Sequence, residues 1–339
     1  MKPSLQVALL ASLLYAPSLN ACDLCAIYRA GDAKGETHDG FLVGVATQFI
    51  PYHTSQFESA KVQPTTPDFL DSTVTHILLG YNFSARFGLS LNTPISHFDF
   101  ARTDLRYSAS APPRVEAETG SISGLGDMSL VGRFTLFQKR TMRWGVGVNW
   151  LVGVKLPTGD SDRIADEISQ TQIYNRFLPP GTPHDPLGHS ITGIHQHSLA
   201  LGTGSVDAIT GLTANANWQR WFFNAQFQYY LRTEGETGFK AGDESILSGG
   251  PGMFLLASPN RTLSLQGNFV HDVMARDEIF GEPSNRTGSR ASYAGPLVTF
   301  TWRSSFSINA GIDVPLHIAN NGFQLVPNYR LHGGVSWTF

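Results

Sequence analysis

Hydrophobic and polar residues alternate strictly at the end of the chain. In NYRLHGGVSWTF, Asn328 to Phe339, the odd positions carry Tyr, Leu, Gly, Val, Trp and Phe, and the even positions carry Asn, Arg, His, Gly, Ser and Thr. A period of two is the side-chain period of a β-strand. One face of this strand therefore suits hydrocarbon, and the other suits water.

The same alternation predicts about twelve strands along the chain. Each is about as long as a tilted strand must be to cross a bilayer. The expected strands cover residues 41–53, 72–83, 86–98, 125–138, 142–156, 204–218, 221–233, 243–256, 261–276, 290–302, 305–317 and 324–339.

The connections between these strands are alternately short and long. A soluble sandwich also has oily and polar strand faces, but it does not require this rhythm of connections. Tight turns at one end, long loops at the other and aromatic residues near strand ends are typical of outer-membrane barrels. We therefore predict an all-β, transmembrane, antiparallel up-and-down β-barrel with short periplasmic turns and long extracellular loops. The longest loops are expected at 99–124 and 157–203.

The N-terminus has the pattern of an export signal. Residues 1–21 combine a basic start, a short apolar run and small residues before a cleavage site. Residues 22–40 would form a periplasmic segment able to plug the barrel, and residues 41–339 the barrel itself. No later stretch could form an apolar helix long enough to span a bilayer, so a closed barrel is the remaining membrane-spanning solution. The expected location is the outer membrane of a Gram-negative bacterium.

Charge excludes one class of partner. Only 15% of residues are charged and the formal net charge is −3, whereas nucleic-acid binding needs a basic surface. Outer-membrane lipid and lipopolysaccharide are the expected surroundings. The last strand should pair with the first, because an unpaired strand edge in lipid would leave backbone groups unsatisfied.

Polar residues on the inward strand faces are the candidates for function. They either pair across the lumen and hold the barrel in shape, or form a polar constriction that steers a small solute. Neither interpretation needs a catalytic residue or a cofactor. The charged candidates for pore lining or constriction are Arg86, Asp127, Arg133, Lys155, Asp207, Arg232, Asp313, Arg330 and His332.

The two cysteines, Cys22 and Cys25, form a CxxC motif at the expected mature N-terminus. Three interpretations are open: a disulfide or redox pair in an oxidising compartment, lipidation of Cys22, or metal binding with partners from elsewhere. No histidine follows Cys25, so the haem-attachment motif is absent.

Histidines are concentrated in the long loop between the fifth and sixth strands. His195 and His197 would point to the same side of an extended segment and could share a metal ion. Ordinary solvated loop histidines are the other interpretation. A loop of this length should fold over or into the pore mouth, or be mobile.

Several motifs resemble a known family. GLGDMSLVGRFTLF (124–137), KLPTGD (155–160), GTGSVD (202–207) and GDES (242–245) are similar to motifs of the outer-membrane transporters labelled for the MetA pathway of phenol degradation. The resemblance spans roughly residues 80–339 and implies a transport barrel. The terminal Trp337 and Phe339 also resemble the signal read by the barrel-assembly machinery.

The sequence therefore predicts a channel or transporter, not an enzyme, for passive passage of a small solute that is hydrophobic or aromatic. One alternative is a lipase-type barrel hydrolase, for which His271 beside Asp272 is a candidate, although no serine stands in a recognisable nucleophile context. The other is a structural or adhesive barrel that presents its loops.

Overall fold

A computed structural model describes residues 40–339, except 64–65, 180 and 182–183. The predicted signal peptide and the cysteine pair Cys22 and Cys25 lie outside the described residues, as does nearly all of the predicted plug segment. No helix of the described part is long and apolar enough to cross a membrane.

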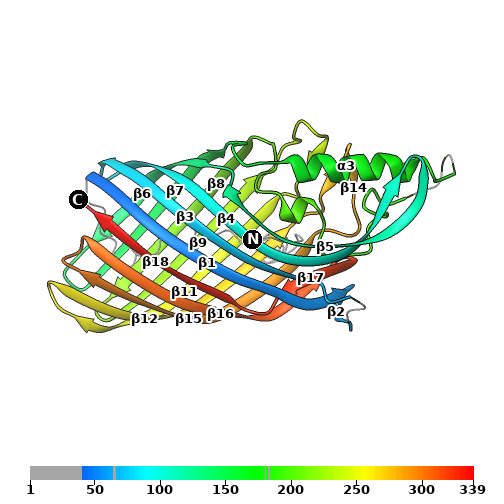
Figure 1. The fold of residues 1–339 in the computed structure, drawn as a ribbon. Helices are drawn as coiled ribbons and strands as arrows, with labels where there is room; N and C mark the ends of the chain where they lie inside the picture. Colours follow the sequence, from blue (N-terminus) through cyan, green and yellow to red (C-terminus); the bar gives the residue numbers. More distant parts are fainter. Residues whose placement is uncertain (1–39, 64–65, 180, 182–183) are drawn as a thin grey trace, which may run out of the picture.

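Twelve long antiparallel strands of the described chain close into one barrel (Figure 1). Each pairs with its neighbour in sequence order, and β1 pairs with both β3 and the last strand, β18, so the ring has no open edge. The prediction of twelve strands is confirmed. The strands are β1 (Gly40–Phe57), β3 (Phe69–Ser84), β4 (Phe87–Ser108), β6 (Ser129–Arg140), β7 (Trp144–Lys155), β8 (Asp207–Trp218), β9 (Trp221–Leu231), β11 (Glu244–Ala257), β12 (Arg261–Met274), β15 (Ser289–Trp302), β16 (Phe306–Asn320) and β18 (Arg330–Thr338).

The chain end closes the barrel as expected. Leu42 pairs with Thr338 and Phe49 with Leu331 in an unbroken antiparallel register. Beyond the last paired residue, the backbone N–H of Phe339 donates to the carbonyl oxygen of Phe41 at 2.9 Å. The alternation at the C-terminus therefore reflects a strand that is hydrogen-bonded on both sides.

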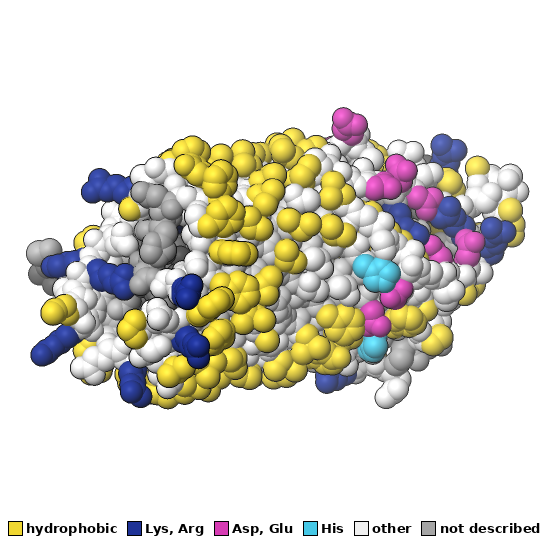
Figure 2. All heavy atoms as spheres, turned by 60° about the vertical axis from the view of Figure 1, so that its left-hand side comes forward, with side chains coloured by type: hydrophobic (Ala, Val, Ile, Leu, Met, Phe, Trp, Pro, Cys, Tyr) yellow, Lys and Arg dark blue, Asp and Glu magenta, His cyan; other side chains and the backbone are white. Residues whose placement is uncertain are grey.

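The apolar half of the alternation faces outward. In β9, Trp221 and Phe223 are 54% and 49% exposed, whereas Asn224 and Gln226 are 6% and 4% exposed. On the face seen in Figure 2, the resulting band of hydrophobic side chains crosses the middle of the barrel, with Lys and Arg at one end and a mixture of charged groups and histidines at the other. A water-soluble sandwich would bury these side chains, so that alternative is excluded.

The two ends of the barrel differ in the length of their connections. Turns of two or three residues join strands at one end, here called the short-turn end. In the turn between β15 and β16, Arg303 and Ser304 have φ of 51° and 59°, the left-handed pair that a tight hairpin turn needs to match the twist of its strands. The opposite, long-loop end carries all the remaining connections.

One predicted loop is a hairpin instead. Residues 99–124 were expected to form a long loop, but β4 continues to Ser108 and returns as β5 (Ala111–Leu125), with Ile95 opposite Leu125 and Arg106 opposite Arg114. This hairpin projects beyond the apolar band, where outward residues need not be hydrophobic. A strand that lies beyond the apolar band can carry polar residues on both faces, so the alternation of hydrophobic and polar residues does not reveal it in the sequence.

The connection between β7 and β8 is the largest structure at the long-loop end. It contains helix α3 (Asp162–Asn175) and the short 3₁₀ helix η2 (His197–Leu199), and α3 lies beside the hairpin in Figure 1. Here we call residues 161–201, as far as they are described, the cap. Minor strands complete the fold: β2 (Ala60–Lys61), β10 (Phe239–Lys240), β13 (Glu278–Ile279), β14 (Glu282–Pro283) and β17 (Phe323–Pro327).

Candidate functional site

Five charged side chains form a continuous network on the inner wall, here called the charge ladder: Asp127, Lys155, Asp207, Arg232 and Glu244. The Lys155 Nζ lies 2.6 Å from Asp127 and 3.0 Å from Asp207. The Arg232 guanidinium lies 3.1 Å from Asp207 and 2.7 Å from Glu244. Charges of opposite sign thus alternate from the segment before β6, through β7 and β8, to the end of β9 and the start of β11. Breaking one pair of such a buried network is costly because it leaves an uncompensated charge.

The ladder joins the separate sequence motifs. Asp127 comes from GLGD, Lys155 begins KLPTGD, Asp207 ends GTGSVD and Glu244 belongs to GDES. Asp127 also accepts hydrogen bonds from the backbone N–H groups of Gly159 and Thr203. The motifs therefore meet in one place, where their side chains hold the end of β7 and the start of β8 in position. Glu244 was not among the predicted site residues, although its motif was noted.

A second network lies on the adjoining part of the wall, from β12 to β18. Arg330 of β18 reaches past β16 and β15 to Asp272 of β12 at 3.4 Å, with its guanidinium 3.6 Å from the ring centre of Tyr293. Next to it, His332 lies 3.2 Å from Asp313, whose carboxylate also accepts from Asn268 at 3.0 Å. The side chain of Arg330 thus spans the inner face of two strands, β16 and β15, to link β18 to β12. Neither Asp272 nor Tyr293 was among the predicted pore-lining residues; Asp272 was noted only as the neighbour of His271 in the hydrolase candidate.

The remaining predicted pore residues lie nearer the short-turn end. Arg133 donates to Asn82 at 2.9 Å and to Thr135 at 3.0 Å. Arg86 is exposed in the turn between β3 and β4, outside both networks. It precedes the first residue of β4, so the strand alternation used to place it inside does not apply there.

An apolar belt lines the inside of the barrel toward the long-loop end, and no sequence expectation covered it. Its members lie on neighbouring strands, where for example Ile209 is directly opposite Tyr230 and Val270 is directly opposite Tyr293, and all are at most 9% exposed. The signal in the sequence is a pair of consecutive apolar residues, as in Leu151 and Val152. Such a pair places one apolar side chain on each face of the strand. The belt comprises Val131, Leu151, Ile209, Tyr230, Ile246, Val270, Ala291, Tyr293, Ile318 and Val326.

The cap folds over and into the mouth of the barrel. Buried Glu167 of α3 accepts hydrogen bonds from the backbone N–H groups of Gln196 and His197 at 3.2 and 3.1 Å and from His197 Nδ1 at 2.6 Å. The other ring nitrogen of His197, Nε2, lies 3.3 Å from Asp277 in the connection between β12 and β15. His197 therefore ties the helix, the inner segment of the cap and the barrel rim together.

Further contacts hold the cap around its edge. Arg102 of β4 donates to the carbonyl oxygen of Ile194 at 3.0 Å, and Arg106 binds Asp166 of α3 at 2.6 Å. On the far side, Arg286 donates to the carbonyl oxygen of Ser190 at 2.5 Å. The cap is thus anchored to the projecting hairpin and to the loop between β12 and β15.

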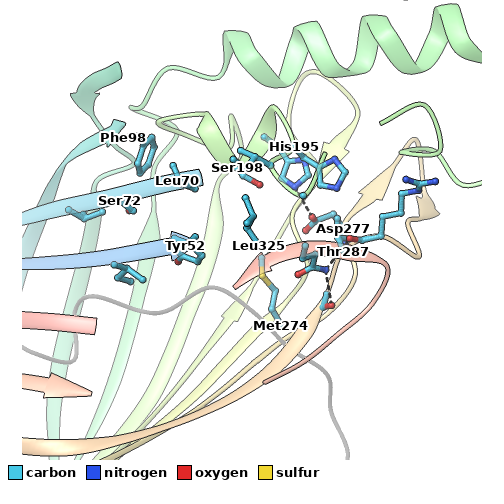
Figure 3. Close-up of a pocket in the computed structure, with 18 of the residues that line it drawn as sticks. Tyr52, Leu70, Ser72, Phe98, His195, Ser198, Met274, Asp277, Thr287 and Leu325 are labelled. Carbon is cyan, nitrogen blue, oxygen red and sulfur yellow. Dashed lines mark hydrogen bonds and ion pairs between the residues drawn. The ribbon is translucent and has the colours of Figure 1, made fainter. Parts of the chain in front are cut away.

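A cavity of about 220 Å³ lies beneath the cap. In Figure 3, Tyr52, Leu70 and Phe98 stand on one side, Met274 on the other, and His195 above. Hydrophobic walls with a few convergent polar groups are the usual composition of a small-molecule site. The full set of lining residues on β1, β3 and β4 is Gln48, Ile50, Tyr52, Leu70, Ser72, Val74 and Phe98.

Burial and charge separate the ionisation of the cap histidines. Burial works against the charged form of His197, but Glu167 and then Asp277 raise its pKa to about 9. Burial lowers the pKa of His195 to about 3, although Glu167 opposes this. Burial also raises the pKa of Asp277. At neutral pH, His197 is an imidazolium between two acids, and His195 is a neutral imidazole.

The cap should therefore loosen at alkaline pH. The folded pKa of His197 lies above its ordinary value of 6.5, so its contribution is complete below pH 6.5 and is lost as the pH rises through about 9. Open events in single-channel records should become more frequent between pH 7 and pH 10. In His197→Gln this pH dependence should vanish, and a dependence equally steep in the variant would contradict the assignment.

The two histidines are not arranged as a metal site. Their rings stack 5.3 Å apart with an angle of 10° between their planes, because η2 replaces the extended segment expected there. Within the ranges that the structure describes, no group of three or more His, Cys, Asp or Glu side chains could hold a metal ion.

The hydrolase candidate His271 has a serine beside it, but no group that would orient its imidazole. His271 Nδ1 lies 2.9 Å from Ser292 Oγ on the neighbouring strand. Its sequence neighbour Asp272 is buried and binds Arg330 in the lumen, so it does not orient the imidazole. A nucleophile, a base and a third group are needed together, and the described contacts supply only the first two.

Comparison with known proteins supports the fold. No family model matches the sequence, and no curated protein matches it as a relative. Among solved structures, an outer membrane channel from Pseudomonas putida F1 aligns with a TM-score of 0.58 at 14% identity, covering 91% of this chain and 98% of that one. The P. putida toluene transporter TodX aligns at a TM-score of 0.40 and 8% identity, covering 96% of each chain. At such identities the first likeness shows a shared barrel fold and the second carries no argument.

Proposed function

We propose that this barrel is an outer-membrane channel of a Gram-negative bacterium that passes a small, mostly apolar solute by passive diffusion. The observation that carries this proposal is the inner surface, which has an apolar belt and a cavity whose wall combines apolar with polar side chains. A lumen built only for ions or sugars would not need this belt. The similarity to a solved outer membrane channel supports the proposal.

Two expectations refine the proposal. The motifs that resemble the MetA-pathway transporters favour an aromatic solute within the apolar class. The terminal Phe339, 65% exposed and stacked on Phe41 with ring centres 5.9 Å apart, is suited to recognition by the barrel-assembly machinery and to contact with lipid and lipopolysaccharide. Cys22 and Cys25 keep their predicted periplasmic role as a disulfide, lipidation or metal site.

Planar-bilayer recording of the purified protein, combined with an assay for released fatty acid, tests this function. Current steps without fatty-acid release support the channel. Fatty acid released by the natural protein and lost in Ser292→Ala would instead support the hydrolase. Neither signal would leave the barrel as a scaffold for its loops and would refute the proposal.

Replacing Arg330 by alanine should make the channel prefer cations. The change removes the guanidinium that lies 3.4 Å from the carboxylate of Asp272. A single charge about 4 Å from a passing ion contributes about 1 kcal/mol even in water, which corresponds to a roughly fivefold preference. Reversal potentials in asymmetric KCl measure this shift. Arg303→Ala removes an exposed arginine from a short turn and should leave selectivity unchanged, so equal shifts in both variants would contradict the assignment.

A further inference from the structure

The cavity beneath the cap holds a polar side chain whose hydrogen-bonding capacity is unused. His195 is only 3% exposed, and neither of its ring nitrogens has a hydrogen-bond partner among the described residues. Leaving a buried polar group unsatisfied costs about 1–3 kcal/mol, so such a position calls for a specific explanation. Because His195 also lines the cavity, a bound molecule would supply the missing partner.

The neighbouring carboxylate decides which nitrogen is available. Glu167 Oε1 lies 3.7 Å from His195 Nδ1, too far for a good hydrogen bond but close enough to favour a proton on that nitrogen. Since burial keeps the ring neutral, Nε2 carries a lone pair. His195 therefore offers the cavity a hydrogen-bond acceptor.

The other groups around His195 favour a neutral molecule. Leu70, Phe98, Ile194 and Leu325 pack together in one hydrophobic cluster. The charged lining residues are engaged elsewhere. His197 lies between Glu167 and Asp277. Asp277 also accepts from the backbone N–H of Gly242 at 2.8 Å, and Arg286 donates to the cap. A charged solute would lose its hydration without gaining a partner.

Size gives a further limit. A cavity of about 150 Å³ lined by hydrophobic residues holds benzene. By proportion, the 220 Å³ beneath the cap would hold a molecule of about nine non-hydrogen atoms.

We propose that His195 determines the specificity of a solute-binding station beneath the cap. The station takes a neutral molecule of about nine non-hydrogen atoms or fewer, with an apolar body and one hydroxyl group that donates to His195 Nε2. This inference rests on the proposed channel function and adds the chemistry by which a passing solute is held.

Two nearly isosteric probes test the inference: cyclohexanol, which has a hydroxyl, and methylcyclohexane, which has a methyl group in its place. The full-length protein in detergent micelles, labelled with ¹⁵N in its histidine rings, is titrated with each probe. Cyclohexanol should shift the His195 signal saturably, and methylcyclohexane should not produce this hydrogen-bond shift. His195→Leu should weaken cyclohexanol binding about tenfold, the loss of one hydrogen bond. His195→Gln retains an acceptor and should restore part of the affinity.

Conductance of the same preparations separates the two proposals. Unchanged cyclohexanol affinity in His195→Leu, or the same His195 shift with both probes, would overturn the binding station even if the channel conducts. Absence of conductance in every preparation would instead refute the channel. The titration of the natural protein stands even if a variant fails to fold.

Discussion

Replacing Glu167 by alanine should make the channel open more often, because it releases the cap from the barrel mouth. The buried carboxylate accepts two backbone hydrogen bonds and the Nδ1 hydrogen bond of His197. Removing one partner of a buried charged pair costs about 3–5 kcal/mol, which would shift the ratio of closed to open caps by about a hundredfold or more. Planar-bilayer recording should show longer open events and a higher mean conductance.

The matched control lies on the same helix. Asp162 is exposed, and Asp162→Ala removes the same charge and a similar volume without touching His197. Its conductance should equal that of the natural protein. Identical records for all three proteins would mean that the cap does not limit passage.

Replacing Asp207 by alanine should produce the largest loss of barrel stability. Asp207 is fully buried and bridges Lys155 and Arg232 at 3.0 and 3.1 Å. Both cations would lose a shared partner, for a cost of about 3–5 kcal/mol. Urea unfolding in detergent micelles, followed by the gel mobility of the folded barrel, measures the loss.

The control for this change is an exposed acid. Asp99 pairs with His97 at 3.1 Å, and its side chain is 52% exposed. Asp99→Ala should cost less than about 1 kcal/mol, as exposed pairs do. If the two variants unfold at the same urea concentration, the charge ladder does not hold the barrel together.

The strands could be predicted because lipid leaves little choice. Each membrane-crossing segment must present hydrocarbon on every second residue, and this constraint marks β9 and β18 in the sequence without reference to their partners. The same constraint ends where the bilayer ends. Phe98 and Phe100 both lie on the inward face of β4, at 9% and 3% exposure, but the polar residues between and beyond them hid the rest of that strand.

The site was less predictable because it depends on pairs far apart in the sequence. Glu167 and His197 are 30 residues apart, and Arg330 and Asp272 are 58 residues apart. The motifs identified Asp127, Lys155 and Asp207 one by one, but only strand pairing brings them together. The apolar belt was missed because the lumen was expected to be polar throughout.

The projecting hairpin bears on how neighbouring barrels meet in a crowded membrane. β5 pairs only with β4 among the described strands, so its outer backbone could in principle recruit a strand from an adjacent molecule. Its sequence begins APPRVE, in which two prolines lack an amide hydrogen and Arg114 and Glu116 add charge. These residues discourage such recruitment. Neighbouring barrels can therefore lie close together without strand pairing between their hairpins, which would lead to aggregation.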